Sequence, residues 1–460
     1  MDLNKLYSSQ RTGNENPTNT NDPRSEYQRD FDRIIFSSAF RRLQNKTQVF
    51  PLPGSVFVHN RLTHSLEVAS VGRSLGTLIG KKIVENYNNQ LSDISKNFYE
   101  HELKNVIAAA CLCHDIGNPA FGHSGEDAIS SFFVENENEL KKYFLDNEKE
   151  WQDLKNFEGN ANSIRVLTHN QKGKMKGGLR LTYSTLSAIA KYPCESTGID
   201  KSSIQRKKFG FFQSEKEIFT KIAKETGMRK TNDEPIVYSR HPFVWIVEAA
   251  DDICYNIIDL EDAHRIGIID HEICKNILYE LVECLNTDIS EQDTIKTNLK
   301  EIEDENDKIS YLRSKAINAL IMRSVEYYIH NLTNILGGTL NESIFNLIKN
   351  DCKKLNEITE FSLKNIYNHR KVVEIENAGY NVMHELLSLF IFPILKDKQE
   401  RTQREKKALE LVPKSFIDDN SNASNYQKVI SIIDFISGMT DNYATELYKR
   451  IKGIKIGMNL

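Results

Sequence analysis

The feature that most limits what this chain can fold into is the helical spacing of its apolar residues. Only ten prolines interrupt 460 residues. In the long stretches between them, apolar side chains recur at positions i, i+3, i+4 and i+7 instead of alternating. This spacing predicts helices over 26–46, 63–86, 103–113, 125–135, 160–167, 243–260, 310–336 and 381–395. The sequence therefore predicts an all-α protein.

One small β-hairpin is expected beside the helices. The segment Thr47-Gln48-Val49-Phe50 favours a strand, ends at prolines, and could pair with Val56-Phe57-Val58 across a Pro-Gly turn. Residues 200–235 are rich in Lys, Ser and Glu and are expected to form a loop-rich excursion on the surface.

Three regions are expected along the chain. Residues 1–24 are rich in Asn, Thr and Ser, lack the apolar core of a secretory signal, and predict a flexible arm. A helical catalytic core is expected over 25–270. A helical C-terminal region over 271–460 is expected to complete the site.

Charge and cysteine content narrow the class of protein. The 60 basic and 64 acidic residues give a net charge of -4, which argues against a cationic surface built for nucleic acid. The seven cysteines lack a CxxC pair and a regular spacing, which favours reduced core thiols. The sequence contains no run of about 18 apolar residues, so it predicts no membrane-spanning helix. We expect a soluble, cytoplasmic protein.

The segment His114-Asp115-Ile116-Gly117-Asn118-Pro119 carries the clearest chemical signal. It follows the small and apolar run 106–113, so a buried helix delivers two adjacent polar residues at its end. Neighbouring residues on a helix point about 100° apart, and both can reach one metal ion only near a terminus. Taken alone, such a pair is more often a cap or a satisfied core histidine.

Two further residues strengthen the interpretation as a metal site. His64 begins an amphipathic helix, and Asp251 lies midway along an apolar helix. Unpaired charges on buried faces are costly, and a shared cation would resolve both. Imidazole and carboxylate ligands together suit Mn, Fe, Zn, Ni or Co, whereas Mg usually takes more oxygen ligands. Four ligands would leave positions for water and a phosphate oxygen.

His123 and Glu126 are the candidate proton-transfer residues. They stand three residues apart where a helix begins near Ser124, so the carboxylate can orient the imidazole and the pair can move a proton. The alternative for His123 is an exposed loop histidine.

The ordered set His64, His114, Asp115 and Asp251 resembles the metal ligands of HD-domain phosphohydrolases. More of the chain resembles the dGTPase-type deoxynucleoside triphosphate triphosphohydrolases of that group. The matching segments are 29–34, 37–43, 46–50, 61–67, 114–123, 157–161, 181–183, 191–193, 210–212, 377–380 and 437–441. Asn162 departs from the family, which more often has Gln there.

This resemblance implies hydrolysis of a dNTP to deoxynucleoside and inorganic triphosphate, with dGTP favoured. It implies one divalent metal ion, which could be Mn, Mg, Co, Ni, Fe or Zn. His123 with Glu126 would activate water or protonate the leaving 5′ oxygen. The resemblance implies phosphate contacts from Arg61, Asn118, Lys191, Tyr192 and Lys208. It implies deoxyribose contacts from Gln48, Val49, Tyr255 and Asp259, and a base contact from Glu376. For Val49 and Tyr255 the alternative is core packing, and for Glu376 it is capping or packing.

The resemblance also implies a homo-oligomer, since family members often form hexamers, and a nucleotide or single-stranded DNA effector at a separate site. Two other functions stay open. One is an HD-type hydrolase of a nucleoside monophosphate, cyclic dinucleotide or signalling nucleotide. The other is a helical scaffold or nucleic-acid-binding module with a vestigial site.

Overall fold

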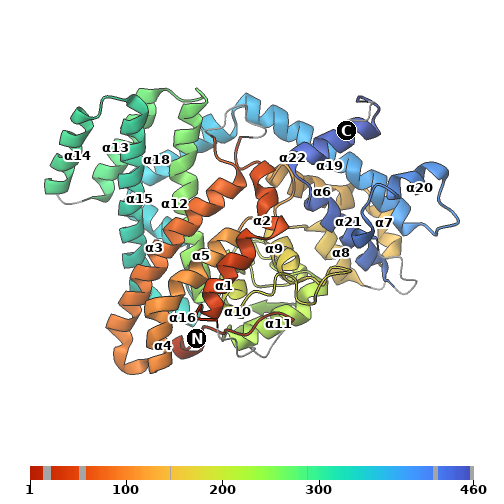
Figure 1. Ribbon diagram of the computed structural model, residues 1–460, viewed down its shortest axis with the longest axis horizontal. Coiled ribbons are helices and arrows are strands. Elements are labelled where there is room, and N and C mark those ends of the chain that lie inside the picture. The colour runs from red at the N-terminus through yellow and green to blue at the C-terminus, as the bar shows by residue number, and fades with distance from the viewer. Residues whose placement is uncertain (14–21, 51–57, 146, 287–288, 418–422, 456–460) are drawn as a thin grey trace.

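Figure 1 presents the computed structural model of the chain, which is built almost entirely from helices. It describes residues 1–13, 22–50, 58–145, 147–286, 289–417 and 423–455. The helical content confirms the predicted all-α class.

Three of the longest helices form one bundle. The helices α3 (Arg61–Tyr87), α12 (Pro242–Arg265) and α15 (Glu305–His330) stand side by side at the left of Figure 1. Helix α5 (Leu103–Cys113) packs along α3. The shorter helices here are α1 (Glu26–Ile35), α2 (Ser38–Arg42), α4 (Asp93–Asn97), α6 (His123–Glu135), α7 (Glu137–Leu140), α8 (Glu148–Lys155), α9 (Gly159–Thr168), α10 (Tyr183–Ile189) and α11 (Lys216–Glu225).

Glycine on α3 allows the close approach that shapes the site. A Cβ atom added at Gly72 would lie 2.5 Å from Cys111 Sγ, and one at Gly76 would lie 2.9 Å from the backbone of Lys104. The axes of α3 and α5 therefore run closer than side chains would permit. This packing brings the beginning of α3 next to the end of α5.

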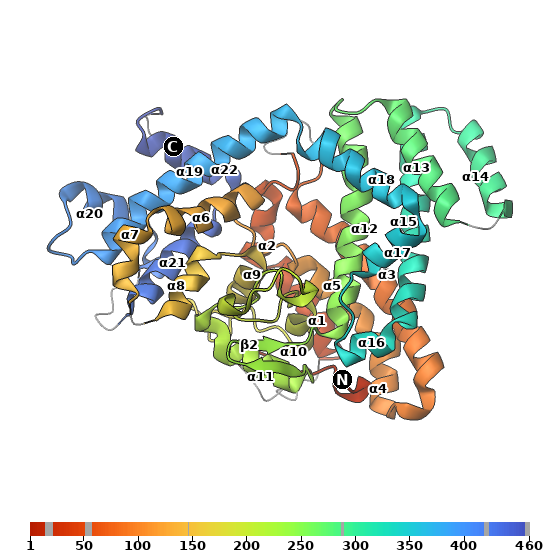
Figure 2. The same ribbon diagram turned by 180° about the vertical axis from the view of Figure 1, so that it is seen from behind.

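The second half adds helices on both sides of this bundle. Figure 2, seen from behind, shows α13 and α14 at one end of the molecule and α20 to α22 at the other. The bounds are α13 (His271–Leu285), α14 (Ile289–Glu301), α16 (Leu332–Gly337), α17 (Ile344–Asp351), α18 (Lys353–Ser362), α19 (Arg370–Leu395), α20 (Gln403–Leu409), α21 (Asn425–Ser437) and α22 (Asp441–Ile451). Two apolar cores result, and each contains residues from both sides of residue 270.

Helix α19 is long and apolar enough to cross a membrane by length and composition. In the structure it packs against α6, α20, α21 and α22. Its buried side chains, among them Met383, Leu387 and Phe390, form part of the second core. Its apolar composition is therefore accounted for by packing within the chain.

The small sheet lies elsewhere than predicted. The strands β1 (Lys230–Asp233) and β2 (Ile236–Tyr238) pair antiparallel, with Lys230 opposite Tyr238 and a bulge before Asn232. In the segment expected to be a strand, Thr47 alone forms a bridge, with Asn60, and 48–50 bend. The hairpin prediction at 47–58 was wrong for these residues, and its partner residues 56–57 lie outside the described part of the chain.

The expected surface excursion at 200–235 is only partly on the surface. Phe209, Phe211 and Phe212 are at most 1% exposed, and α11 buries Phe219 and Ile222 completely. These aromatic side chains belong to the two cores. Residues 200–208 are mostly turn and 229–234 are exposed, as expected, but the prediction was wrong for 209–228, which pack into the protein.

The expected flexible arm is also corrected for residues 1–13. Leu6 is fully buried, and the guanidinium of Arg11 is paired with Glu26 and, at 2.6 Å, with Asp30. The amino group of Met1 donates to the carbonyl of Leu336 at 2.6 Å. Apolar burial and ion pairs outweigh the polar composition that predicted an arm.

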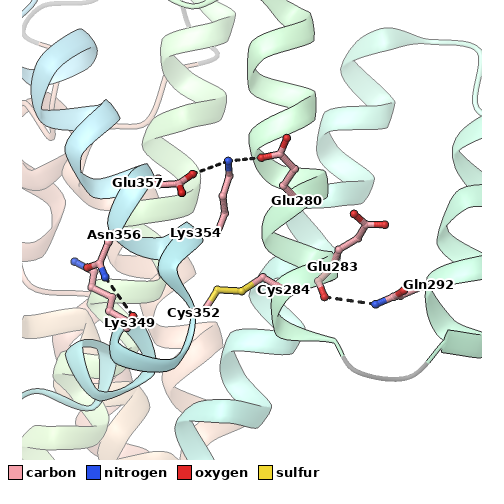
Figure 3. The surroundings of a disulfide bond; sticks show 9 residues. All are labelled: Glu280, Glu283, Cys284, Gln292, Lys349, Cys352, Lys354, Asn356 and Glu357. Atoms are coloured by element: carbon pink, nitrogen blue, oxygen red, sulfur yellow. Dashed lines mark hydrogen bonds and ion pairs between the residues drawn. A yellow bond between two sulfur atoms is a disulfide. The ribbon is translucent and has the colours of Figure 1, made fainter.

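Two cysteines form a disulfide, contrary to the prediction of reduced thiols throughout. Figure 3 shows Cys284 of α13 bonded to Cys352, which directly precedes α18. The two helices pack together and bring the Cα atoms to 6.2 Å. The remaining cysteines are buried free thiols. A pairing across 68 residues leaves no spacing signal in the sequence.

Candidate active site

The four predicted metal ligands come from three helices and meet at one point. His64 lies in the first turn of α3, His114 and Asp115 follow α5, and Asp251 lies midway along α12. His64 Nε2 is 3.1 Å from Asp251 Oδ1, and His114 Nε2 is 3.5 Å from both Asp251 Oδ1 and Asp115 Oδ2. Ligand atoms of His64, His114 and Asp115 all lie within 4.8 Å of one another.

The protonation of His114 suits a metal ligand. Its Nδ1 lies 2.7 Å from the carbonyl of Cys111, which holds the ring with a proton on that nitrogen. Its Nε2 is buried and has no hydrogen-bond partner. A buried acceptor without a partner is costly, so the lone pair is directed at a position that a cation would fill. The donor set therefore fits one divalent ion.

The two carboxylates of the cluster are kept ionised. Burial opposes ionisation of Asp115, but the positive charge of Arg61, followed by the electrostatic effect of the His114 ring, outweighs it and lowers the pKa of Asp115. Burial likewise opposes ionisation of Asp251, and interactions with His114 and His64 lower its pKa well below the usual range. Arg61 forms a direct ion pair with Asp115, and Asn118 donates to the same carboxylate at 2.6 Å.

A cavity of about 450 Å³ opens above the cluster. All the predicted site residues except His64 and Asp259 line it. His64 lies beneath Asp251, and Asp259 lies behind a tyrosine pair described below. A cavity of this size suits a ligand as large as a nucleotide.

Two lysines that line the cavity are each paired with a glutamate. Lys191 Nζ lies 3.2 Å from Glu248 Oε1, and Lys208 Nζ lies 2.8 Å from Glu158 Oε2. Burial lowers the pKa of Lys191, but the negative charge of Glu248 more than offsets it, so the pKa is raised. Burial also lowers the pKa of Lys208, but the negative charge of Glu126, with that of Glu158, more than offsets it, so the pKa of Lys208 is raised. Both side chains are positive at neutral pH.

The predicted pair His123 and Glu126 lies at the start of α6 without direct contact. No hydrogen bond joins them among the residues that the structure describes. Glu126 Oε1 accepts the Gly159 N–H at 3.0 Å, and burial, followed by the charge of Glu158, raises its pKa to about 8. The ring of His123 is open to the cavity, yet the surrounding protein and the charges of Arg61 and Lys208 lower its pKa.

A tyrosine pair closes the opposite end of the cavity. Tyr255 on α12 stacks on Tyr367, with ring centroids 5.2 Å apart. The Tyr367 hydroxyl donates to Asp259 Oδ2 at 2.7 Å. Burial raises the pKa of Asp259 well above its usual value, although the bond from Tyr367 opposes the rise. Tyr255 and Asp259 are thus one turn apart on the same face of α12.

The remaining predicted contacts sit near this end. Gln48 and Val49 line the cavity, and the buried Gln48 Oε1 has no hydrogen-bond partner. Glu376 on α19 lines it too, and burial, then the charge of Asp127, raises the pKa of Glu376.

Sequence reasoning missed several residues of the cavity wall. Tyr367 had no signal, because it lies in a π-helical turn, 363–367, outside every recognised motif. Glu158 and Asn160 lie inside a matching segment but were given no role. Glu248 and Asp252 stand beside Asp251 on α12, and their helical spacing could have indicated them.

Comparison with known proteins agrees with this architecture. The model of the HD domain matches residues 61–188, and that of the phosphohydrolase-associated domain matches residues 350–450. Together, the helical fold, the His–Asp cluster and these matches define an HD-domain hydrolase.

Relatives narrow the family further. A deoxyguanosinetriphosphate triphosphohydrolase-like protein of Synechocystis sp. is 36% identical, covering 99% of this chain and 100% of that protein. A protein of the same description from Pseudomonas aeruginosa is 35% identical over 98% of this chain and 99% of its own length. A deoxyguanosinetriphosphate triphosphohydrolase of Salmonella paratyphi A is 30% identical over 93% and 94%. The chain therefore belongs to the deoxyguanosinetriphosphate triphosphohydrolase-like family.

Proposed function

We propose that this protein hydrolyses a deoxynucleoside triphosphate, preferably dGTP, to deoxynucleoside and inorganic triphosphate. The observation that carries the proposal is the convergence of His64, His114, Asp115 and Asp251 at the base of a nucleotide-sized cavity that Arg61, Lys191 and Lys208 also line. The names of the Salmonella relative and of the triphosphohydrolase-like relatives support the choice of substrate.

The activity is proposed to depend on one divalent ion held by His64, His114, Asp115 and Asp251. Mn, Mg, Co, Ni, Fe and Zn are the candidates, and the imidazole nitrogens favour the transition metals. Such an ion would polarise a phosphoryl oxygen and lower the pKa of bound water. Arg61 and Asn118 hold Asp115 in place for this role.

The triphosphate is proposed to lie along the basic residues of the cavity. Arg61, Asn118, Lys191, Tyr192 and Lys208 present guanidinium, amide, ammonium and phenol donors to the cavity. Positive charges stabilise the charge that develops on a transferring phosphoryl group, and they also bind the phosphates that stay attached to it. Glu248 and Glu158 position the two ammonium groups and keep them protonated.

His123 is proposed to move a proton, with Glu126 assisting. The lowered pKa of His123 leaves its imidazole neutral at pH 7, so it can accept a proton from the attacking water. The raised pKa of Glu126 keeps a proton available near the leaving 5′ oxygen. Attack at the α phosphorus then releases the three phosphates as one piece.

The deoxyribose is proposed to stack near Tyr255, with Gln48, Val49 and Asp259 around it. A ring packed closely against C2′ leaves no room for a ribose hydroxyl, which favours dNTPs over NTPs. Glu376 is proposed to contact the base. Tyr367 supports this end from behind Tyr255.

The test is a panel of four dNTPs and GTP, each assayed with Mg, Mn or Co by chromatography of the products. Triphosphate release from dNTPs supports the proposal. Monophosphate release or phosphodiester cleavage would favour another HD-type hydrolase. Equal behaviour of the native protein and His114→Ala, in products and in bound metal, would favour a scaffold with a vestigial site.

We also propose a cytoplasmic homo-oligomer, with a hexamer as the candidate assembly, regulated by a nucleotide or single-stranded DNA at a separate site. The family membership is the support for this proposal. Light scattering of the purified chain, with and without added dNTP or oligonucleotide, measures the assembly directly; a monomer under every condition would contradict it.

A further inference from the structure

The junction between α21 and α22, residues 437–441, holds two separate parts of the cavity wall. Lys46 Nζ donates to the carbonyl of Asn118 at 2.5 Å and to that of Ser437 at 2.8 Å. Lys46 is 4% exposed, so these bonds form inside the protein. The segment after Lys46 and the turn after Asn118 are thereby joined to the C-terminal helices.

Asp441 makes a second connection between the same two segments. Its Oδ1 accepts the N–H of Phe121 at 3.0 Å. Its Oδ2 accepts the N–H of Thr47 at 2.9 Å and also the Thr47 hydroxyl. Asp441 is 1% exposed, and a buried carboxylate bonded in this way is strongly localised.

The backbone that Asp441 holds is unusual. Phe121 has a φ of 63° and Gly122 a φ of 59°, and the left-handed conformation is rare for an aromatic residue. Helix α6 begins directly afterwards, with His123. A Cβ added at Gly379 of α19 would lie 2.4 Å from Phe121 Cγ, so the C-terminal region also encloses the ring of Phe121. Such a turn persists when surrounding contacts determine it.

We propose that Asp441 is a positioning residue for the hydrolytic reaction. One of its oxygens holds the turn that presents His123, and the other holds the segment that presents Gln48 and Val49. The carboxylate thus sets the separation between the proton-transfer group and the sugar-binding segment. This inference rests on the proposed function, because it assigns a purpose to the geometry of that site.

The variant Asp441→Asn tests the proposal with little change in shape. An asparagine offers one carbonyl oxygen where the carboxylate served two segments, and its amide group faces an N–H donor. Because small misplacements of reacting groups are costly, we expect kcat to fall on the order of 10²-fold. We expect the preference for a dNTP over the matching NTP to narrow, which a general loss of folded protein would not cause.

Amide hydrogen exchange gives a readout that does not depend on activity. In Asp441→Asn the amides of Phe121 and Thr47 should exchange faster than in the native protein, while those around His64 and Asp251 should be unchanged. Thr47→Val is the second variant, because it removes only the hydroxyl bond and keeps the branched shape. Thr47→Val should show a smaller fall in kcat and a smaller rise in exchange at the Thr47 amide. It replaces Asp441→Asn as the test if that variant does not fold.

Asp434→Asn is the matched control. Asp434 also lies at the end of α21 and binds the core through two 2.7 Å bonds from Arg165, but it contacts neither segment of the cavity wall. It should lower thermal stability without changing the dNTP preference or exchange at Phe121.

Three outcomes overturn one proposal or the other. Unchanged hydrogen exchange at the amides of Phe121 and Thr47 in Asp441→Asn would show that Asp441 does not hold the two segments. If these amides exchange faster in Asp441→Asn but kcat and the preference for a dNTP over the matching NTP stay as in the native protein, Asp441 does not position the reacting groups. A native protein inactive on every dNTP overturns the proposed function, and exchange alone then decides whether Asp441 holds the two segments.

Discussion

The hydroxyl of Tyr367 donates a hydrogen bond to Asp259 while its ring stacks on Tyr255. Tyr255 and Asp259 belong to α12, whereas Tyr367 follows α18 and lies within the phosphohydrolase-associated match. The end of the cavity assigned to the sugar is therefore assembled from two distant parts of the chain.

Tyr367→Phe should weaken substrate binding more than it slows turnover. The change keeps the stacked ring but leaves the buried Asp259 oxygen without its donor, which costs about 1–3 kcal/mol. We expect KM for the dNTP to rise roughly tenfold, with a smaller change in kcat, measured by steady-state kinetics. Tyr328→Phe is the control, since the buried Tyr328 hydroxyl bonds Pro242 away from the cavity. An equal rise in KM in both variants would contradict this role.

Asp251→Asn should remove the metal ion. The new amide side chain leaves His64 and His114 without the anionic ligand that they share. Loss of a residue that only supports a metal ligand lowers metal affinity by up to about 100-fold, so loss of a ligand should lower it at least as much. Elemental analysis of dialysed protein measures the loss. Asp252→Asn changes the neighbouring carboxylate, which bonds neither histidine, and should retain the metal. Full occupancy in Asp251→Asn would place the ion elsewhere.

Glu126→Gln should change how stability depends on pH. Burial and Glu158 raise the pKa of Glu126 from 4.5 to about 8, so the folded state binds a proton that the unfolded state releases. The resulting stabilisation is complete below pH 4.5 and is lost as pH rises through about 8. The native protein should therefore lose at least ~1 kcal/mol relative to Glu126→Gln across this range, measured by urea unfolding. Glu217→Gln, a control at an exposed position, should show the same dependence of unfolding free energy on pH as the native protein.

Breaking the disulfide should destabilise the α13–α18 contact. A cross-link that closes a loop of 68 residues typically contributes about 2–4 kcal/mol. Cys284→Ser and Cys352→Ser should each lower the melting temperature, and a reductant should lower that of the native protein to the same value. Cys274→Ser, which removes a buried free thiol of α13, should stay sensitive to reductant. Melting curves unaffected by reductant would show that the bond does not form in solution.

The sequence predicted the elements that depend on local pattern. Helices α5 and α9 begin and end within a residue of their predicted bounds, because apolar spacing and helix-ending turns are encoded locally. The residues proposed as metal ligands could be selected because each is a polar group within or at the end of a helix with a buried apolar face. Their convergence depends on the glycine-mediated packing of α3 against α5, which spacing alone does not reveal.

What could not be predicted depends on contacts between distant segments. Polar composition suggested an arm at the N-terminus, but Leu6 and Arg11 find partners more than a hundred residues away, at His241 and Arg180. In the segment expected to be a strand, the side chain of Asp441, and not a neighbouring strand, accepts the Thr47 N–H. Tyr367 and the Cys284–Cys352 pair carry no local signal at all.

Helix α19 places Val372 and Glu376 in the cavity wall and, two to four turns later, Met383 and Phe390 in the second core. A chimera that joined the first 300 residues of this chain to the remainder of a 35% identical homologue would exchange ligand contacts and core packing at the same time. Recombination between such genes should therefore yield few active hybrids unless substitutions at the cavity end and at the core end of this helix are exchanged together with their neighbours.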